Sequence, residues 1–106
     1  MTEKTKNKRA VIPRDARKSD DFIRDWENLL RSGRHDMNRI KEAMMLLIAN
    51  DAPLPPEWKD HQLSGELKNM RECHVKGDLL LVYQIHNKGK REAISFSRVG
   101  THSEIF

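Results

Sequence analysis

The fold is decided by the most apolar run of the chain, LLLVYQIH at residues 79–86. Two further runs flank it and alternate at a period of two, NMRECHV at residues 69–75 and KREAISFSR at residues 90–98. The glycine-containing stretches VKGD and NKGK separate the three runs. Runs of this kind joined by glycine turns are typical of β-hairpins. The sequence therefore predicts an antiparallel meander of three strands with residues 79–86 at its centre.

Two helices are predicted before the meander. The first lies within SDDFIRDWENLLRSG, where Ser19 suits the N-cap and Gly33 suits the residue after the last turn. Its apolar stripe is Phe22, Ile23, Trp26, Leu29 and Leu30. The second begins after Asp36 and ends at Asn50, with an apolar face made of Met37, Ile40, Met44, Leu47 and Ile48. The short link between them predicts an αα-hairpin.

A first strand is predicted at RAVIP, residues 9–13, and ends at Pro13. The preceding residues 1–8 are polar and basic, and we expect a flexible arm there. The rest of the chain, residues 9–106, is expected to form a single domain. The predicted class is α+β, with an N-terminal strand and a helical hairpin packed on one face of a twisted antiparallel sheet. The other face of the sheet is then open for function.

Composition narrows the class of protein. At 106 residues the chain has room for one modest core. The single cysteine, Cys73, excludes an internal disulfide framework and fits a reducing cytoplasm. No apolar run is long enough to cross a bilayer, and the first residues lack the apolar region of a signal peptide, so we expect no membrane contact. The net charge of +4 is a weak indication of a polyanionic partner.

Polar residues suited to proton transfer gather in the second half of the chain. They are His61, His74, Asp78, Arg98 and His102. Strand alternation puts His74 and Glu72 on one face and Cys73 and Val75 on the other. Cleaving RNA without a metal requires a base for the 2′-hydroxyl proton, an acid for the leaving 5′-oxygen and a cation for the phosphoryl charge. Histidines suit the first two tasks and an arginine suits the third.

Other interpretations stay open at this point, because each of these residues taken singly is more often structural. His61 could be an ordinary loop residue, and Arg98 could pair with Asp78 or Glu92. A zinc site built from the three histidines and Asp78 is disfavoured, because the chain has no compact ligand pair such as H-x-x-x-H or C-x-x-C. We therefore expect no metal and no cofactor.

Arg98 also conflicts with the strand pattern, since it shares the alternation of Ile94 and Phe96, which have the character of core residues. Either a β-bulge turns its side chain to the other face, or it emerges at the rim of the core.

Three segments resemble the YafQ branch of the RelE/ParE superfamily of bacterial toxins: PLPPEWKDHQLSG at residues 53–65, RECHVKGDLLLVYQI at 71–85 and RVGTHSEIF at 98–106. HDMNRIKEAMMLLIAN, residues 35–50, is similar to the family's second helix. The resemblance runs from about residue 9 to the end of the chain. It implies a toxin that enters the ribosomal A site and cleaves mRNA there by 2′-hydroxyl attack, without metal.

The resemblance also implies roles for individual residues. His102 would be a principal proton-transfer residue, assisted by His61 and His74. Asp78 would orient or support a histidine, and Arg98 would bind the phosphate.

Aromatic positions of the family bear on how the RNA is held. Phe106 would place or stack a base, as aromatic rings do on single-stranded RNA. Leu79 stands where the family often has tryptophan, which removes a stacking surface.

The implied partners are a cognate antitoxin that silences the toxin, the ribosome with its 16S rRNA, and mRNA. The toxin itself is expected to be a monomer within a toxin–antitoxin assembly. Two other functions stay possible on the sequence, a ParE-like gyrase inhibitor and an RNA-binding module without catalysis, since a shared fold does not separate them.

Overall fold

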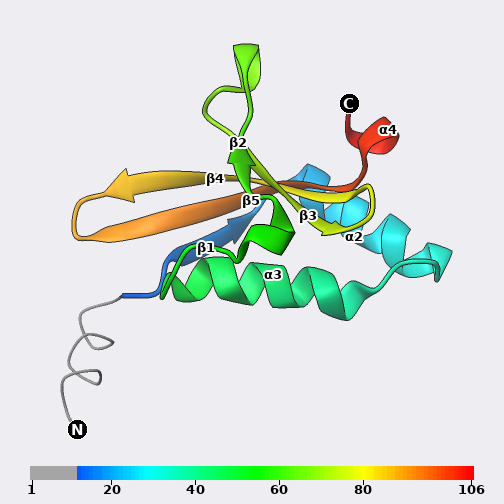
Figure 1. The fold of residues 1–106 in the computed structure, drawn as a ribbon, viewed down its shortest axis with the longest axis horizontal. Helices are drawn as coiled ribbons and strands as arrows, with labels where there is room; N and C mark the ends of the chain where they lie inside the picture. The colour runs from blue at the N-terminus through cyan, green and yellow to red at the C-terminus, as the bar shows by residue number, and fades with distance from the viewer. Residues whose placement is uncertain (1–11) are drawn as a thin grey trace, which may run out of the picture.

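A five-stranded sheet forms the centre of the computed structural model, which describes residues 12–106, in the order β1-β5-β4-β3-β2 (Figure 1). The strands are β1 (Asp15–Lys18), β2 (His61–Gln62), β3 (Arg71–Lys76), β4 (Leu79–Lys88) and β5 (Arg91–Thr101). β4 pairs antiparallel with both β3 and β5. The predicted meander with its apolar central strand is confirmed.

The first strand lies further along the chain than predicted. Of the predicted residues 9–13, residues 9–11 lie outside the described part, as does the arm at 1–8, and Ile12 and Pro13 are not in a strand. β1 pairs parallel with β5, and Asp15 lies opposite Ala93. It is an edge strand whose side chains are mostly exposed, so pairing here does not depend on an apolar sequence. The prediction followed the apolar residues before Pro13, whereas the observed strand lies in the polar segment after it.

The helices begin and end at the predicted caps. α2 (Asp20–Ser32) follows Ser19, whose hydroxyl accepts a hydrogen bond from the Phe22 amide at 3.0 Å. α3 (Met37–Ala49) follows Asp36, whose carboxylate accepts one from the Arg39 amide at 3.2 Å. Side-chain acceptors at these positions satisfy amides that the first helical turn leaves unpaired.

The remaining helical elements are short. They are the 3₁₀ turns η1 (Pro56–Trp58) and η2 (Gly65–Leu67) and the final turn α4 (His102–Ile105).

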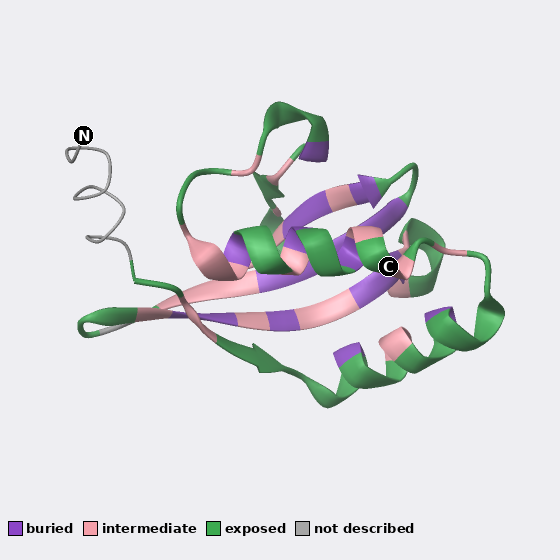
Figure 2. Ribbon diagram, turned by 90° about the horizontal axis from the view of Figure 1, so that it is seen from below, coloured by how far each residue is buried: buried purple, intermediate pink, exposed green. Residues whose placement is uncertain are grey.

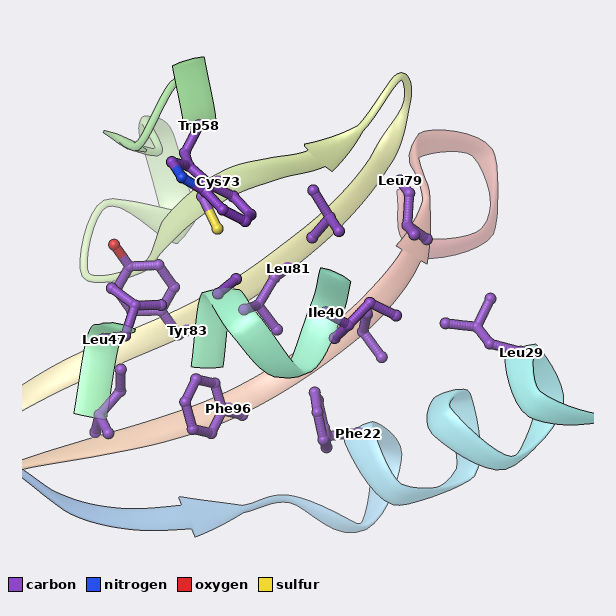
Figure 3. Close-up of a cluster of buried hydrophobic side chains, with 14 residues drawn as sticks. Phe22, Leu29, Ile40, Leu47, Trp58, Cys73, Leu79, Leu81, Tyr83 and Phe96 are labelled. Carbon is purple, nitrogen blue, oxygen red and sulfur yellow. The ribbon is translucent and has the colours of Figure 1, made fainter. Parts of the chain in front are cut away.

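The core lies between α3, α2 and one face of the sheet (Figures 2 and 3). Its buried members are Phe22, Leu29, Ile40, Ala43, Leu47, Trp58, Cys73, Val75, Leu79, Leu81, Tyr83, Ile94, Phe96 and Val99. Two members of the predicted stripe of α2 are not part of it, since Ile23 and Leu30 are exposed. α2 packs mainly against β5, so only a narrow side of this helix meets apolar partners.

The sequence prediction of an α+β fold with helices on a sheet is confirmed. In the described part of the chain, no helix combines the length and the apolar character that crossing a membrane requires.

Candidate active site

His61, Glu72 and His74 meet on the sheet face opposite the core. β2 pairs with β3 so that His61 lies opposite Glu72, and His74 lies two residues further along β3 on the same face. The Nε2 atom of His61 is 3.3 Å from Glu72 Oε2, and the Nε2 atom of His74 is 3.7 Å from the same oxygen. The two rings have centroids 6.0 Å apart. The carboxylate of Glu72 is therefore close enough to interact with both imidazole rings.

Glu72 is the residue that sequence reasoning missed as a member of the site. It is only 7% exposed, and it is the one charged residue that is buried in the described part of the chain. Burying a carboxylate costs free energy unless partners compensate. The two imidazoles are such partners when protonated. The signal in the sequence was its place on the same strand face as His74.

The backbone holds His61 in a defined orientation. Its Nδ1 atom lies 2.8 Å from the carbonyl oxygen of Lys59. A carbonyl can only accept a hydrogen bond, so Nδ1 must carry the proton and Nε2 is left to face Glu72. Lys59 has a φ of +51°, an uncommon left-handed conformation for a residue other than glycine. The residue whose carbonyl orients the His61 ring thus has a left-handed backbone conformation.

Asp60 anchors the same loop on the core side of the sheet. Its carboxylate accepts hydrogen bonds from Arg71 at 3.3 and 3.2 Å and from the hydroxyl of Tyr83. Burial, and then the hydrogen bond to Asp60, raise the pKa of Tyr83, so its hydroxyl remains a donor at physiological pH. Asp60 and His61 are adjacent, so this anchor limits the movement of His61.

A β-bulge in β5 breaks the face alternation of the strand just before Arg98. Phe96 lies opposite Tyr83, but Arg98 lies opposite Val82, so Ser97 is the extra residue. Phe96 and Val99 both remain in the core, on either side of the shift. The bulge alternative is therefore confirmed.

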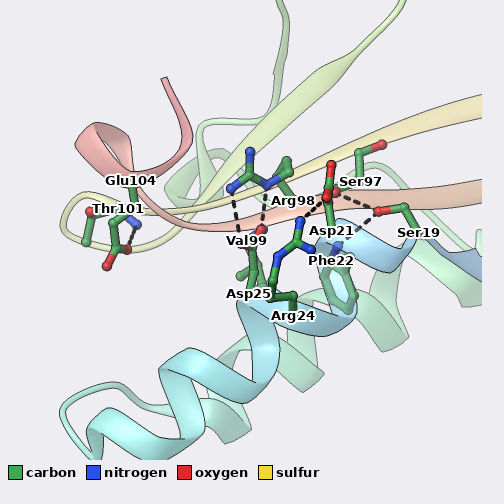
Figure 4. Close-up of polar contacts among 10 residues, drawn as sticks. All are labelled: Ser19, Asp21, Phe22, Arg24, Asp25, Ser97, Arg98, Val99, Thr101 and Glu104. Carbon is green, nitrogen blue, oxygen red and sulfur yellow. Dashed lines mark hydrogen bonds and ion pairs between the residues drawn. The ribbon is translucent and has the colours of Figure 1, made fainter.

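The partner of Arg98 is neither Asp78 nor Glu92, so both pairings considered from the sequence are wrong. Its Nε and Nη2 atoms lie 2.7 and 3.1 Å from the two carboxylate oxygens of Asp25 on α2 (Figure 4). Glu92 pairs instead with Arg14, at 2.9 Å. After the bulge, the guanidinium of Arg98 lies against α2. The sequence alone does not indicate that Asp25, a polar residue of that helix, is its partner.

His102 and Phe106 form an ordered end to the described chain. α4 begins at His102, and Thr101 and Glu104 cap it reciprocally, with the Thr101 amide donating to Glu104 at 2.8 Å. That backbone hydrogen bond is the main cause of the lowered pKa of Glu104. The rings of His102 and Phe106 have centroids 5.2 Å apart, and Phe106 is half exposed. The terminal aromatic ring is therefore held near a histidine and is open to solvent.

The five predicted polar residues do not form one contact network. The row His74–Leu80–Gly100 crosses β3, β4 and β5 in register, two residues before His102. Since neighbouring strands lie about 4.8 Å apart, His74 and Gly100 lie about 10 Å apart. Asp78 is exposed in the β3–β4 turn, and its side chain makes no hydrogen bond or ion pair with the other described residues. The structure thus puts the histidine–carboxylate group and α4 on either side of β4.

Cys73 and Leu79 are both buried in the core, which limits the part that either can take in the site. Burial, with the charges of Asp60 and Glu72, raises the pKa of Cys73 to about 12, so its thiol is a poor nucleophile. Leu79 is 3% exposed and belongs to the core, so it offers no surface on the face of His74.

A surface groove of about 420 Å³ runs beside His74, between β3 and the start of α3. Arg39, Lys59 and Lys76 line it together with the acidic residues Asp36 and Glu57. The groove joins the edge of the histidine cluster to a surface with a small excess of positive charge.

Comparison with known proteins shows the family. Residues 14–106 match the family described as "Bacterial toxin of type II toxin-antitoxin system, YafQ". The mRNA interferase toxin YafQ of Escherichia coli is 40% identical over 97 residues, which cover 91% of this chain and 99% of that protein.

Two solved structures are similar over nearly their whole length. The toxin of the E. coli DinJ–YafQ toxin–antitoxin complex has a TM-score of 0.74 and 38% identity, covering 90% of this chain and 99% of that one. A metal-bound toxin from Helicobacter pylori has a TM-score of 0.74 and 41% identity, covering 87% and 98%. The RelE/ParE-like fold expected from the sequence is confirmed, and the chain belongs to the YafQ family of type II toxin–antitoxin toxins.

Proposed function

We propose that this toxin is a ribosome-dependent endoribonuclease that cleaves mRNA in the A site by attack of a ribose 2′-hydroxyl on the adjacent phosphorus. The observation that carries the proposal is the buried carboxylate of Glu72 between the Nε2 atoms of His61 and His74. The name of the E. coli relative, an mRNA interferase, supports the same activity.

The cluster is suited to removing the 2′-hydroxyl proton. An imidazole that accepts this proton becomes positively charged, and a neighbouring carboxylate stabilises that charge and keeps the ring in place. Either histidine has this support, because both lie near the same oxygen of Glu72. The bond from the 2′-oxygen to phosphorus forms while the bond to the 5′-oxygen breaks, which leaves a 2′,3′-cyclic phosphate.

The leaving 5′-oxygen needs a proton from the other side of the phosphorus. His102 lies beyond β4 from the cluster, and we assign it the role of the acid that donates this proton. Arg98 would stabilise the phosphoryl charge with the part of its guanidinium that Asp25 does not hold. Phe106, half exposed beside His102, would stack on a base.

These proton transfers use side chains alone and require no metal. The H. pylori relative is a metal-bound toxin. Asp78, in its exposed turn, would support the site through contacts made with RNA or ribosome.

The partners follow from the substrate. The ribosome with its 16S rRNA and the mRNA would approach the open face, and the groove lined by Arg39, Lys59 and Lys76 offers positive charge to a phosphate backbone. A cognate antitoxin would silence the toxin, as the E. coli toxin–antitoxin complex indicates. The toxin would be a monomer within such an assembly and would act in the cytoplasm.

Cell-free translation with primer extension along the message tests the proposal. We expect cuts at A-site codons with the wild-type protein and with His86→Gln, since His86 bonds Ser95 away from the site at 3.2 Å. His102→Ala should abolish the cuts.

Intact message during continued translation would overturn the proposal. Arrest of translation with intact message would support the RNA-binding alternative, and inhibition of DNA gyrase would support the ParE-like one.

A further inference from the structure

Asp25 is a largely buried carboxylate on α2 that accepts three hydrogen bonds from two adjacent residues of β5. The donors are Nε and Nη2 of Arg98, at 2.7 and 3.1 Å, and the backbone amide of Val99, at 3.1 Å. The side chain of Asp25 is 13% exposed, whereas that of Arg98 is 32% exposed. The carboxylate is therefore shielded by the protein, while part of the guanidinium remains open to solvent.

The two contacts to Asp25 occupy one edge of the planar guanidinium of Arg98. An arginine side chain has five N–H donors in a fixed fork, and Asp25 takes the Nε donor and one Nη2 donor. Three donors remain, on Nη1 and Nη2, and Nη1 points away from Asp25 (Figure 4). Arginine binds phosphate groups through two parallel donors of this kind. A second pair of donors is thus left for two oxygens of a phosphoryl group.

The ion pair sets the direction of these free donors before any RNA is bound. A long side chain such as arginine has many conformations when nothing holds its charged end. Asp25 restricts Arg98 in the free protein through two hydrogen bonds with the geometry of a bidentate pair. Donors that are already in place stabilise the charge that develops on phosphoryl oxygens without reorganising during the reaction.

The same carboxylate lies close to α4, the element that begins at His102. A cavity of about 230 Å³ is lined by Asp25, Arg98 and Glu104, among other residues. The amide of Val99, which Asp25 also binds, belongs to the last part of β5 before α4. The hydrogen bond to Val99 therefore also limits the movement of the strand that leads to His102.

We propose that Asp25 is a positioning residue of the ribonuclease, which holds the guanidinium of Arg98 in the orientation that receives the scissile phosphate. The inference rests on the proposed function, because it requires Arg98 to contact the phosphoryl oxygens. Asp25 acts only through Arg98 and the end of β5. An ion pair that merely joined α2 to β5 would stabilise the fold but would leave the cleavage rate of the folded protein unchanged.

A double-mutant cycle on the single-turnover rate of mRNA cleavage on ribosomes separates these two roles. Asp25→Asn keeps the size of the side chain and removes the charge that holds both guanidinium donors. We expect it to lower the rate about tenfold to a hundredfold, the range for loss of a charge-assisted hydrogen bond. In an Arg98→Ala background the same substitution should change the rate less than about twofold, because the group that it orients is already absent.

Asp21→Asn is the matched control, since it removes a charge from an exposed ion pair with Arg24 on the same helix. It should cleave at nearly the wild-type rate. Urea unfolding of every variant sets conditions in which all the proteins compared are folded. If Asp25→Asn does not fold, Asp25→Glu, which displaces the carboxylate by one methylene group, enters the same cycle.

Solvent exchange of the Nε proton of Arg98, followed by NMR, reports the orientation of the guanidinium without reference to activity. We expect slow exchange in the wild-type protein and exchange at least about tenfold faster in Asp25→Asn, because the proton loses its acceptor. Equal exchange in the two folded proteins would overturn the proposal.

The cleavage assay distinguishes failure of this proposal from failure of the proposed function. With an active wild-type protein, an unchanged rate in folded Asp25→Asn, or an equal loss in both backgrounds, would overturn the positioning role and leave the ribonuclease standing. An unchanged rate in Arg98→Ala would do the same. A wild-type protein that cleaves no message would instead refute the proposed function, and the positioning role with it.

Discussion

Arg98 and Asp25 are joined by two hydrogen bonds of 2.7 and 3.1 Å between guanidinium and carboxylate, although they are far apart in the chain. Asp25 also accepts a hydrogen bond from the backbone amide of Val99 at 3.1 Å. The pair therefore attaches α2 to the bulge in β5, as Figure 4 shows. The hydrogen bond to Asp25 is the main cause of the raised pKa of Arg98, so the guanidinium stays positively charged at physiological pH.

Asp25→Ala should destabilise the protein by about 2 kcal/mol, because it removes charge-assisted hydrogen bonds to Arg98 and to a backbone amide. Urea unfolding measures the change. Asp21→Ala is the matched control on the same helix, because Asp21 pairs with Arg24 at an exposed position, and this variant should cost less than about 0.5 kcal/mol. Equal effects of the two variants would contradict a structural role for the Asp25 pair.

Tyr83→Phe should lower the cleavage rate more than its modest loss of stability explains. The variant keeps the buried ring and removes the hydrogen bond to Asp60, which precedes His61. We expect a loss of about 1 kcal/mol in urea unfolding and a reduced kcat with KM nearly unchanged. Full activity of the folded variant would show that Arg71 alone anchors the loop.

Cys73 should react with iodoacetamide far more slowly in the folded protein than in urea. Burial raises the pKa of its thiol from 9.0 to about 12, so at pH 8 the reactive thiolate is on the order of a thousandfold rarer. The raised pKa also makes the protonated Cys73 thiol contribute to the stability of the folded protein. This contribution is fully present below about pH 9 and is lost as the pH rises toward 12, because the thiol of the unfolded chain loses its proton first. Rapid labelling of the folded protein at pH 8 would contradict this burial.

Phe106→Ala should reduce kcat/KM by about tenfold or more without changing stability. The ring is half exposed and has little core packing to lose, whereas base stacking contributes about 1–3 kcal/mol. Phe106→Tyr keeps an aromatic face and should restore activity. An alanine variant with normal cleavage would show that Phe106 does not contact the message.

Local patterns in the sequence were sufficient for most of the fold. Ser19 and Asp36 cap the two helices as predicted, because capping depends on residues within one turn. The central strand followed from its apolar run. The first strand was misplaced, because an edge strand paired in parallel needs no apolar signal. The spacing of apolar residues could not show that Ile23 and Leu30 face solvent, since this depends on where β5 lies.

The site was predictable only in part. The histidines and Arg98 were found as residue types with suitable chemistry, but their partners depend on tertiary contacts. Glu72 meets His61 across the β2–β3 pair, and Asp25 meets Arg98 from another element. The chain has no compact pair of metal ligands such as H-x-x-x-H or C-x-x-C. Pairing of strands brings His61 to Glu72 and His74 without such a motif.

The most direct test of the central claim is the single-turnover rate of mRNA cleavage on ribosomes by Glu72→Gln. The variant keeps the shape of the side chain and removes the charge between the two histidines. We expect a fall of at least about a hundredfold, within the range that proton-transfer catalysis contributes. Glu92→Gln, which alters a pair with Arg14, is the control and should cleave at nearly the wild-type rate. An unchanged rate in a folded Glu72→Gln protein would contradict the catalytic role of the cluster.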